Sequence, residues 1–136
     1  MNMSLLVEEL KHDEGVKFKP YQCSSGKLTI GIGRNIEERG ISDSEAEFML
    51  KNDIDICIDE LKKAFSWYDN LSDKRQRVMI NMCFNLGLGK LKGFKKFLQA
   101  MDDQIWNIAA EEMLDSRWAD QVGDRAVRLA LMVLEG

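Results

Sequence analysis

Helical spacing of hydrophobic residues is the main pattern along the chain, and it is clearest between residues 42 and 64. Ala46, Met49 and Ile54 fall there on one face of a helix. The segment opens with a capping box, in which the side chains of Ser42 and Glu45 each bond the other's backbone N–H. The same spacing predicts further helices from Ser4 (as the cap) to about Glu14, from Ser72 or Asp73 to Leu86, from near Gly93, over Gln104–Leu114 and over Asp124–Leu134.

The pattern changes between residues 16 and 32, where the alternation of a strand replaces the helical spacing. Leu28, Ile30 and Ile32 alternate with polar or small residues. A turn at residues 24–26, Ser-Ser-Gly, predicts a hairpin back to an earlier strand around Lys17–Tyr21. A small hairpin among helices is an α+β pattern, and 136 residues fit one compact domain.

Two glycines interrupt the second predicted strand. Gly31 and Gly33 weaken a strand, so they suggest the close approach of another backbone or of a ligand. A phosphate-binding loop is excluded, because its GxGxxG spacing would need a glycine at Ile36.

The charge of the chain limits its partners. The formal net charge is −4, which does not favour general binding to nucleic acid or to an anionic membrane. The stretch from Lys74 to Lys96, however, contains basic residues and no acidic one. This stretch either faces an anionic polymer or forms a solvated helix face, and the sequence leaves both open.

The three cysteines, Cys23, Cys57 and Cys83, are an odd number without CxxC spacing. A disulfide framework or a zinc site is therefore not expected, and reduced thiols in a cytosolic protein are the simplest interpretation. The N-terminal segment has only a short apolar cluster, Leu5 to Val7, and predicts neither a signal peptide nor a membrane span. A target outside the cytoplasm would thus require a separate delivery route.

Glu14 is a candidate general acid at the C-terminal end of the first predicted helix. The negative end of the helix dipole penalises ionisation there and favours the neutral acid. By spacing alone, a surface residue in the last helical turn is the stronger interpretation. Thr29, on the opposite face from Leu28 and Ile30, by itself fits a surface strand residue better than a catalytic hydroxyl.

Histidine and aromatic residues indicate no second kind of site. His12, the only histidine, has no evident serine or cysteine partner and is expected to be exposed on its helix. The aromatic residues are expected in the core rather than as platforms for sugars: Phe84, Phe94, Phe97, Trp106 and Trp118.

Several short motifs follow one another in a fixed order. They are Asp13-Glu14-Gly15, Tyr21, Thr29-Ile30-Gly31-Ile32-Gly33, the run from Ile80 to Gly87, Gly93-Phe94, Ser116-Arg117-Trp118 and Asp124-Arg125-Ala126. In order and spacing, over nearly the whole chain, they resemble the phage-type lysozymes of glycoside hydrolase family 24, the T-even phage members above all.

The resemblance implies an α+β, two-lobed lysozyme-like fold within a single domain. A small β-hairpin lobe takes up residues 15–41, and a linking helix residues 42–64. The helical lobe comprises residues 1–14 and 65–136, so the first helix is expected to pack with the C-terminal helices. The sugar chain is expected in the cleft between the lobes.

The resemblance also implies an activity and its residues. The activity is that of a muramidase, an endolysin that hydrolyses the β-1,4 bond between N-acetylmuramic acid and N-acetylglucosamine in peptidoglycan. The family's catalytic glutamate and threonine fall on Glu14 and Thr29, and the arginine partner of the glutamate falls on Arg125. Cleft-lining, substrate-binding positions fall on Asn35, Phe84, Asn85 and Arg117.

No cofactor or metal is implied, and peptidoglycan is the expected partner. Nucleic acid and stable membrane insertion are not expected. The protein is expected to be a monomer in the host cytoplasm until a holin opens the membrane.

Three departures from the family pattern matter. The family's catalytic aspartate, nine residues after the glutamate, is replaced by Cys23, which is expected to be reachable from solvent at the site while Cys57 and Cys83 are shielded. Arg34 replaces a histidine, and the segment that follows is short. The loss of the aspartate leaves an alternative open, a catalytically impaired peptidoglycan-binding module. A wall-penetrating lysozyme of a phage tail or secretion apparatus is another.

Overall fold

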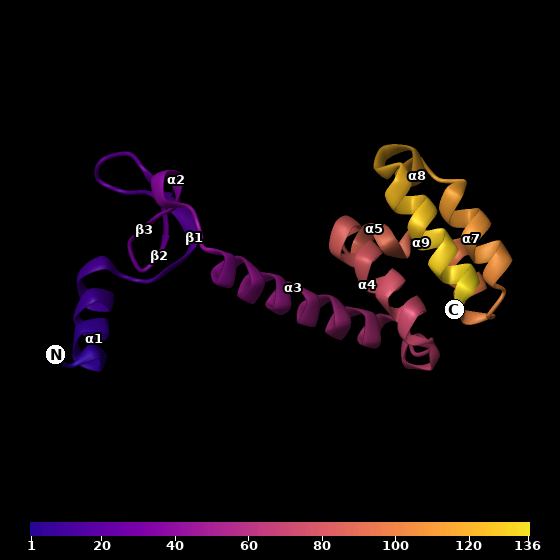
Figure 1. Cartoon of the computed structure of the whole chain (residues 1–136), viewed down its shortest axis with the longest axis horizontal. Helices are drawn as coiled ribbons and strands as arrows, with labels where there is room; N and C mark the ends of the chain where they lie inside the picture. The colour runs from indigo at the N-terminus through magenta and orange to yellow at the C-terminus, as the bar shows by residue number, and fades with distance from the viewer. The chain divides into compact units, whose positions relative to one another are not determined.

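A computed structural model describes all 136 residues of the chain, coloured along the sequence in Figure 1. The chain forms two compact units, Met1–Phe48 and Met49–Gly136. No helix combines the length and the apolar character that crossing a bilayer requires. The expected packing of the first helix with the C-terminal helices stays a prediction.

The first unit begins with helix α1 (Met3–Glu14). Its N-terminus is capped by Asn2, whose Oδ1 accepts a hydrogen bond from the Leu5 N–H at 3.1 Å. The prediction of Ser4 as the cap is therefore wrong, because Ser4 already lies in the first helical turn. The helix ends after Glu14, as predicted: Gly15 follows with φ at 73°, and its N–H donates to the Lys11 carbonyl at 2.9 Å.

A three-stranded antiparallel sheet follows, in the order β1 (Lys17–Gln22), β2 (Leu28–Gly31) and β3 (Arg34–Asn35). The predicted hairpin turn is confirmed, since the Gly26 N–H donates to the Cys23 carbonyl at 2.8 Å. The third strand and the short helix α2 (Ile36–Arg39) were not expected. Both are too short for a periodic pattern to indicate them.

Thr29 lies at the centre of this sheet, opposite Tyr21 on β1 and Asn35 on β3. Only 3% of Thr29 is exposed, whereas Leu28 beside it is 39% exposed. The interpretation of Thr29 as a surface residue is therefore wrong. The third strand, absent from the sequence prediction, gives Thr29 a neighbour on both sides.

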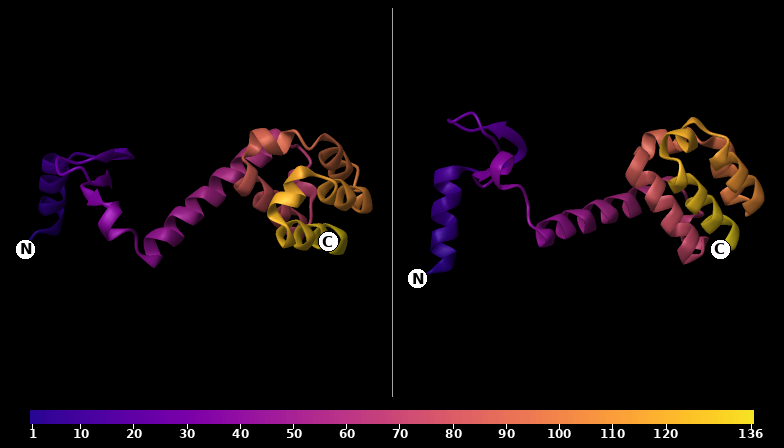
Figure 2. Two further views of the ribbon diagram at one scale, coloured as in Figure 1. Left: turned by 90° about the horizontal axis from the view of Figure 1, so that it is seen from above. Right: turned by 45° about the horizontal axis from the view of Figure 1, so that its top comes forward.

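Helix α3 (Asp43–Ala64) begins in the first unit and continues into the second as one unbroken helix (Figure 2). Its capping box is confirmed: the Glu45 N–H donates to Ser42 Oγ at 3.2 Å, and the Ser42 N–H donates to Glu45 Oε1 at 2.9 Å. Arg34 adds two bonds to the same carboxylate, at 3.0 and 2.7 Å, and a third to the Gly40 carbonyl at 3.1 Å. The residue that departs from the family histidine thus ties β3 to the start of α3.

Acid should loosen this connection. The Arg34 guanidinium, helped by Ser42, lowers the pKa of Glu45 to about 2. A carboxylate with a lowered pKa stabilises the fold above its unfolded-state pKa, about 4.3, and this contribution is lost as the pH falls toward about 2. Hydrogen exchange of residues 34–48 should therefore accelerate over that range in the parent more than in Glu45→Gln. Glu47→Gln, which removes an unpaired neighbouring carboxylate, should behave like the parent; an equal response in all three proteins would contradict this prediction.

The second unit is helical. After the C-terminal part of α3 it contains η1 (Tyr68–Asn70), α4 (Asp73–Leu86), α5 (Leu88–Lys92), α6 (Lys95–Asp102), α7 (Trp106–Leu114), α8 (Arg117–Val122) and α9 (Asp124–Glu135). Ser72 caps α4 by accepting from the Arg75 N–H at 3.2 Å, as the sequence predicts. Helices α5 and α8 were not predicted.

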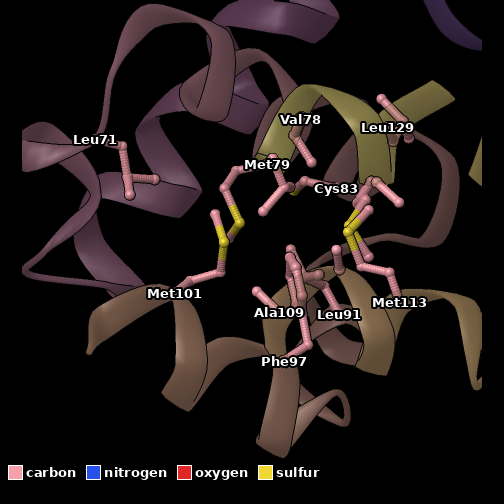
Figure 3. Packing of buried hydrophobic residues seen from close by; sticks show 14 of the residues in the cluster. Leu71, Val78, Met79, Cys83, Leu91, Phe97, Met101, Ala109, Met113 and Leu129 are labelled. Carbon is pink, nitrogen blue, oxygen red and sulfur yellow. The ribbon is translucent and has the colours of Figure 1, made fainter. Parts of the chain in front are cut away.

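The core of the second unit is rich in sulfur (Figure 3). Met79, Met101 and Met113 are at most 1% exposed and pack with large side chains such as Phe97 and Leu91. Flexible thioethers fill the irregular spaces between short helices. The predicted shielding of Cys57 and Cys83 is confirmed, with 7% and 3% of these residues exposed.

Candidate active site

Glu14, the last residue of α1, lies against the loop that follows β2. A Cβ atom at Gly33 would lie 2.7 Å from Glu14 Oε2 and 2.9 Å from its Cδ. The absence of a side chain at Gly33 therefore makes room for the carboxylate. The sequence pattern indicated the close approach of a backbone or a ligand at Gly31 and Gly33. The structure instead has the Glu14 side chain at Gly33 and nothing within 4 Å of a Cβ at Gly31. The contact gives Glu14 a defined position although the residue is exposed.

A methyl group at Gly33 should displace this carboxylate. We expect Gly33→Ala to reduce the glycoside hydrolysis that the resemblance implies by about ten- to a hundredfold, because a displacement of about 1 Å at a reacting group can cost that much. Gly31→Ala is a matched control: φ is +71° there and +65° at Gly33, but nothing lies within 4 Å of a Cβ at Gly31. Equal losses in the two folded variants would assign the effect to backbone strain and not to Glu14.

Cys23 and Thr29 share one backbone acceptor in the same unit. The Cys23 N–H and the Thr29 hydroxyl both donate to the Lys27 carbonyl, each at 2.9 Å. Because the Thr29 proton is used in this way, its oxygen lone pairs remain able to accept a bond from a water molecule. The turn between β1 and β2 thus holds both residues at one carbonyl group, and their catalytic roles stay a prediction of the resemblance.

The Cys23 thiol is partly exposed, and its Sγ lies 3.1 Å from Ser25 Oγ. Hydrogen bonds from the Ser25 side chain, then from the backbone of Lys27 and of Ser25, lower the pKa of the Cys23 thiol to about 7. A large fraction is therefore thiolate at neutral pH. From the sequence, Ser25 is recognised only as a turn residue; the signal for its contact is a hydroxyl two residues after a cysteine in a tight turn.

Asn35 has a local role in the structure. Its Oδ1 accepts a bond from the Glu38 N–H at 3.1 Å and caps α2. Its position across from Thr29 puts it beside the expected catalytic hydroxyl. The assignment of Asn35 to substrate binding stays a prediction.

The other expected cleft residues belong to the second unit. Phe84 is 45% exposed, so the expectation that it belongs to the core is wrong, whereas Phe97 and Trp118 are buried. Asn85 Oδ1 accepts a bond from the Trp118 indole N–H at 2.8 Å, and the Arg125 Nε donates to Asn81 Oδ1 at 2.9 Å. Both polar groups are thereby held in place by their own unit.

Two open hollows in the second unit contain these residues. Phe84 and Arg125 line one of about 420 Å³, together with Leu50, Ile80 and Asn81. Arg117 lines another of about 450 Å³ with Phe94, Lys95, Lys96 and Glu112. The resemblance predicts that these surfaces face Glu14 and Thr29, and this stays a prediction.

The basic stretch has two parts with different roles. Lys74 pairs with Glu135 at 3.0 Å, Arg77 pairs with Asp73 at 2.9 Å, and Arg75 lies 3.6 Å over the Trp106 ring. The remaining cations are exposed without an acidic partner and form what we call the free-lysine patch: Lys90, Lys92, Lys95 and Lys96. The cations of the first part are paired within the fold, so the free-lysine patch is the better candidate for contact with an anionic polymer.

Neither His12 nor any acidic cluster forms a metal site. His12 is exposed on α1, as expected. No group of three or more His, Cys, Asp or Glu side chains is arranged to hold a metal ion.

Comparison with known proteins gives a consistent result. The model of the family "Phage lysozyme" matches residues 11–132. The chain is 29% identical to "Probable T4-type lysozyme 2" of Dictyostelium discoideum, over 93% of this chain and 92% of the relative. It is 28% identical to "Probable T4-type lysozyme 1" of the same organism, over 98% of this chain and 96% of the relative.

A third relative is much longer. The chain is 28% identical to "Pre-baseplate central spike protein Gp5" of Enterobacteria phage T4, over 99% of this chain but only 28% of that protein. The family match covers Glu14 and Gly33, the Cys23–Thr29 pair and most of the helical second unit. With its α+β architecture, the chain therefore belongs to the phage lysozyme family and is a glycoside hydrolase of the lysozyme type.

Proposed function

We propose that the protein is a muramidase that hydrolyses the β-1,4 bond between N-acetylmuramic acid and N-acetylglucosamine in peptidoglycan. The proposal is based on one observation: the Glu14 carboxylate lies directly against Gly33, in the same unit as the Cys23–Thr29 pair. Most glycoside hydrolases cleave the glycosidic bond with two acidic groups, of which one is protonated and the other ionised. A thiol with a pKa of about 7 can supply the ionised group.

The reaction proceeds by direct displacement. Glu14 donates its proton to the glycosidic oxygen, and that bond breaks with its electron pair on the departing sugar hydroxyl. A water molecule bound to the Thr29 oxygen attacks the anomeric carbon from the other face. The Cys23 thiolate stabilises the positive charge that develops at the sugar and takes the proton from the water. The product is inverted at the anomeric carbon, as the family resemblance implies.

The bond cleaved can be identified from the new reducing end. Purified peptidoglycan is digested, reduced with borohydride and hydrolysed to its sugars. The acid hydrolysis also removes the acetyl groups, so the appearance of muramitol is the expected result. Glucosaminitol alone would show cleavage of the other glycosidic bond and would contradict the muramidase assignment.

The biological role that we propose is that of an endolysin. The protein waits as a monomer in the host cytoplasm until a holin opens the membrane, after which it reaches the wall. Co-expression with a holin gene should cause abrupt lysis, and expression alone should not.

The similarity to Gp5 favours a second candidate, a lysozyme carried by a phage tail. A location of the gene beside tail genes, and lysis of cells from outside without a holin, would support this second candidate.

The free-lysine patch is proposed to hold the anionic wall. We expect the reversal of Lys92, Lys95 and Lys96 to glutamate to slow association with wall fragments by about tenfold or more at low salt, and to flatten its salt dependence. The control reverses Lys51, Lys62 and Lys63 on α3, which changes the net charge equally. Similar effects of both triple variants would show that net charge, and not this patch, governs binding.

A further inference from the structure

Only one thiol of this protein is both accessible and ready to ionise near neutral pH. Burial raises the pKa of Cys57, and burial together with Cys57 raises that of Cys83 to about 12. Cys23 is partly exposed, and its Sγ lies within hydrogen-bond distance of the Ser25 hydroxyl. The role of that neighbour follows from the geometry of the turn.

The turn fixes the distance between the two side chains. The Gly26 N–H donates to the Cys23 carbonyl at 2.8 Å, and the Cys23 N–H donates to the Lys27 carbonyl at 2.9 Å. These two bonds close the turn around Ser25, and Gly26 adopts the required positive φ of 79°. Ser25 Oγ then lies 3.1 Å from Cys23 Sγ without any rearrangement of the backbone.

The direction of this hydrogen bond depends on the ionisation of the sulfur. A thiolate has no proton, so only the Ser25 hydroxyl can donate. The bond is therefore strongest when the sulfur is charged, and it restricts the rotation of the Cys23 side chain in that state. The Ser25 hydroxyl makes no other hydrogen bond that would compete for its proton.

We propose that Ser25 is a positioning residue for Cys23: its hydroxyl donates to Sγ and holds the deprotonated sulfur in place at the position of the family carboxylate. This inference rests on the proposed function, in which Cys23 acts as the anionic group. In this proposal Ser25 acts on the reaction only through Cys23.

The direct test is the pH dependence of Cys23 alkylation by iodoacetamide, measured at the level of the peptide by mass spectrometry. The parent should show a midpoint of about pH 7. Ser25→Ala should raise this midpoint toward that of an ordinary thiol, about 8.5, and a rise of one unit should slow alkylation at pH 6 by about tenfold. Ser25→Thr keeps the hydroxyl and should retain the parental midpoint, and Ser24→Ala, the neighbouring turn residue, should leave it unchanged.

Wall hydrolysis by the same folded variants tests the link to the reaction. The acidic limb of the pH–rate profile should move upward in Ser25→Ala by the same amount as the alkylation midpoint. An alkylation midpoint that stays at the parental value in Ser25→Ala overturns the proposal, as does an active parent whose pH–rate profile is unaffected by Ser25→Ala. If the parent and all of these Ser24 and Ser25 variants lack hydrolase activity over the whole pH range, the proposed function is refuted instead. This outcome is distinguishable from failure of the Ser25 proposal, in which the parent is active.

Discussion

Glu14→Gln is expected to lower the rate of peptidoglycan hydrolysis by at least about a hundredfold, the lower end of what general acid catalysis contributes. The amide is similar in size to the acid, so it can occupy the same position against Gly33. It cannot protonate the glycosidic oxygen, and the departing sugar would have to leave as an alkoxide. The release of new reducing ends from purified peptidoglycan measures this rate directly.

The matched control is Asp13→Asn, which removes the neighbouring carboxylate at the end of the same helix. It changes the net charge and the helix terminus equally, and the rate should stay close to that of the parent. Circular dichroism should show both variants folded. Near-normal hydrolysis by folded Glu14→Gln would remove Glu14 from the mechanism.

Replacement of Cys23 should separate an active lysozyme from an inactive relative. We expect Cys23→Ser to lose most of the hydrolysis at pH 7, because serine has a similar shape but stays neutral. Cys23→Asp restores the carboxylate of the family and should match or exceed the parent. The same initial-rate assay measures both variants.

The pH dependence of these rates is a sharper observable than their size. The thiolate is lost as the pH falls through about 7, so the parent should lose activity on that side. Cys23→Asp should keep its activity to lower pH, since the reference pKa of an aspartate is about 3.9. An identical acidic limb in both proteins would exclude the thiolate from the reaction.

Two further outcomes concern the alternatives. A silent parent with an active Cys23→Asp variant would indicate a peptidoglycan-binding module that has lost its activity. If both proteins were folded and silent, the transfer of family roles to Glu14 and Thr29 would itself be wrong. Alkylation of the parent adds bulk as well as removing charge, so it cannot replace these substitutions.

The sequence by itself determined the parts of this protein that depend on near neighbours. The capping box of α3, the end of α1 at Gly15 and the hairpin turn before Lys27 all involve residues within four positions of one another. Propensity and turn chemistry act over that range, so a pattern in the sequence suffices. The order of the motifs likewise sufficed for the family, which the match over residues 11–132 confirms.

The tertiary structure alone decided the environment of the candidate site. Thr29 is buried because an unpredicted strand pairs with β2, and Gly33 accommodates Glu14 from a helix that ends 19 positions earlier. The basic stretch falls into a paired part and a free part because Lys74 forms an ion pair with Glu135, 61 residues away. Such contacts join segments whose separate patterns carry no information about each other, so only the folded chain reveals which side chains are enclosed, paired or free.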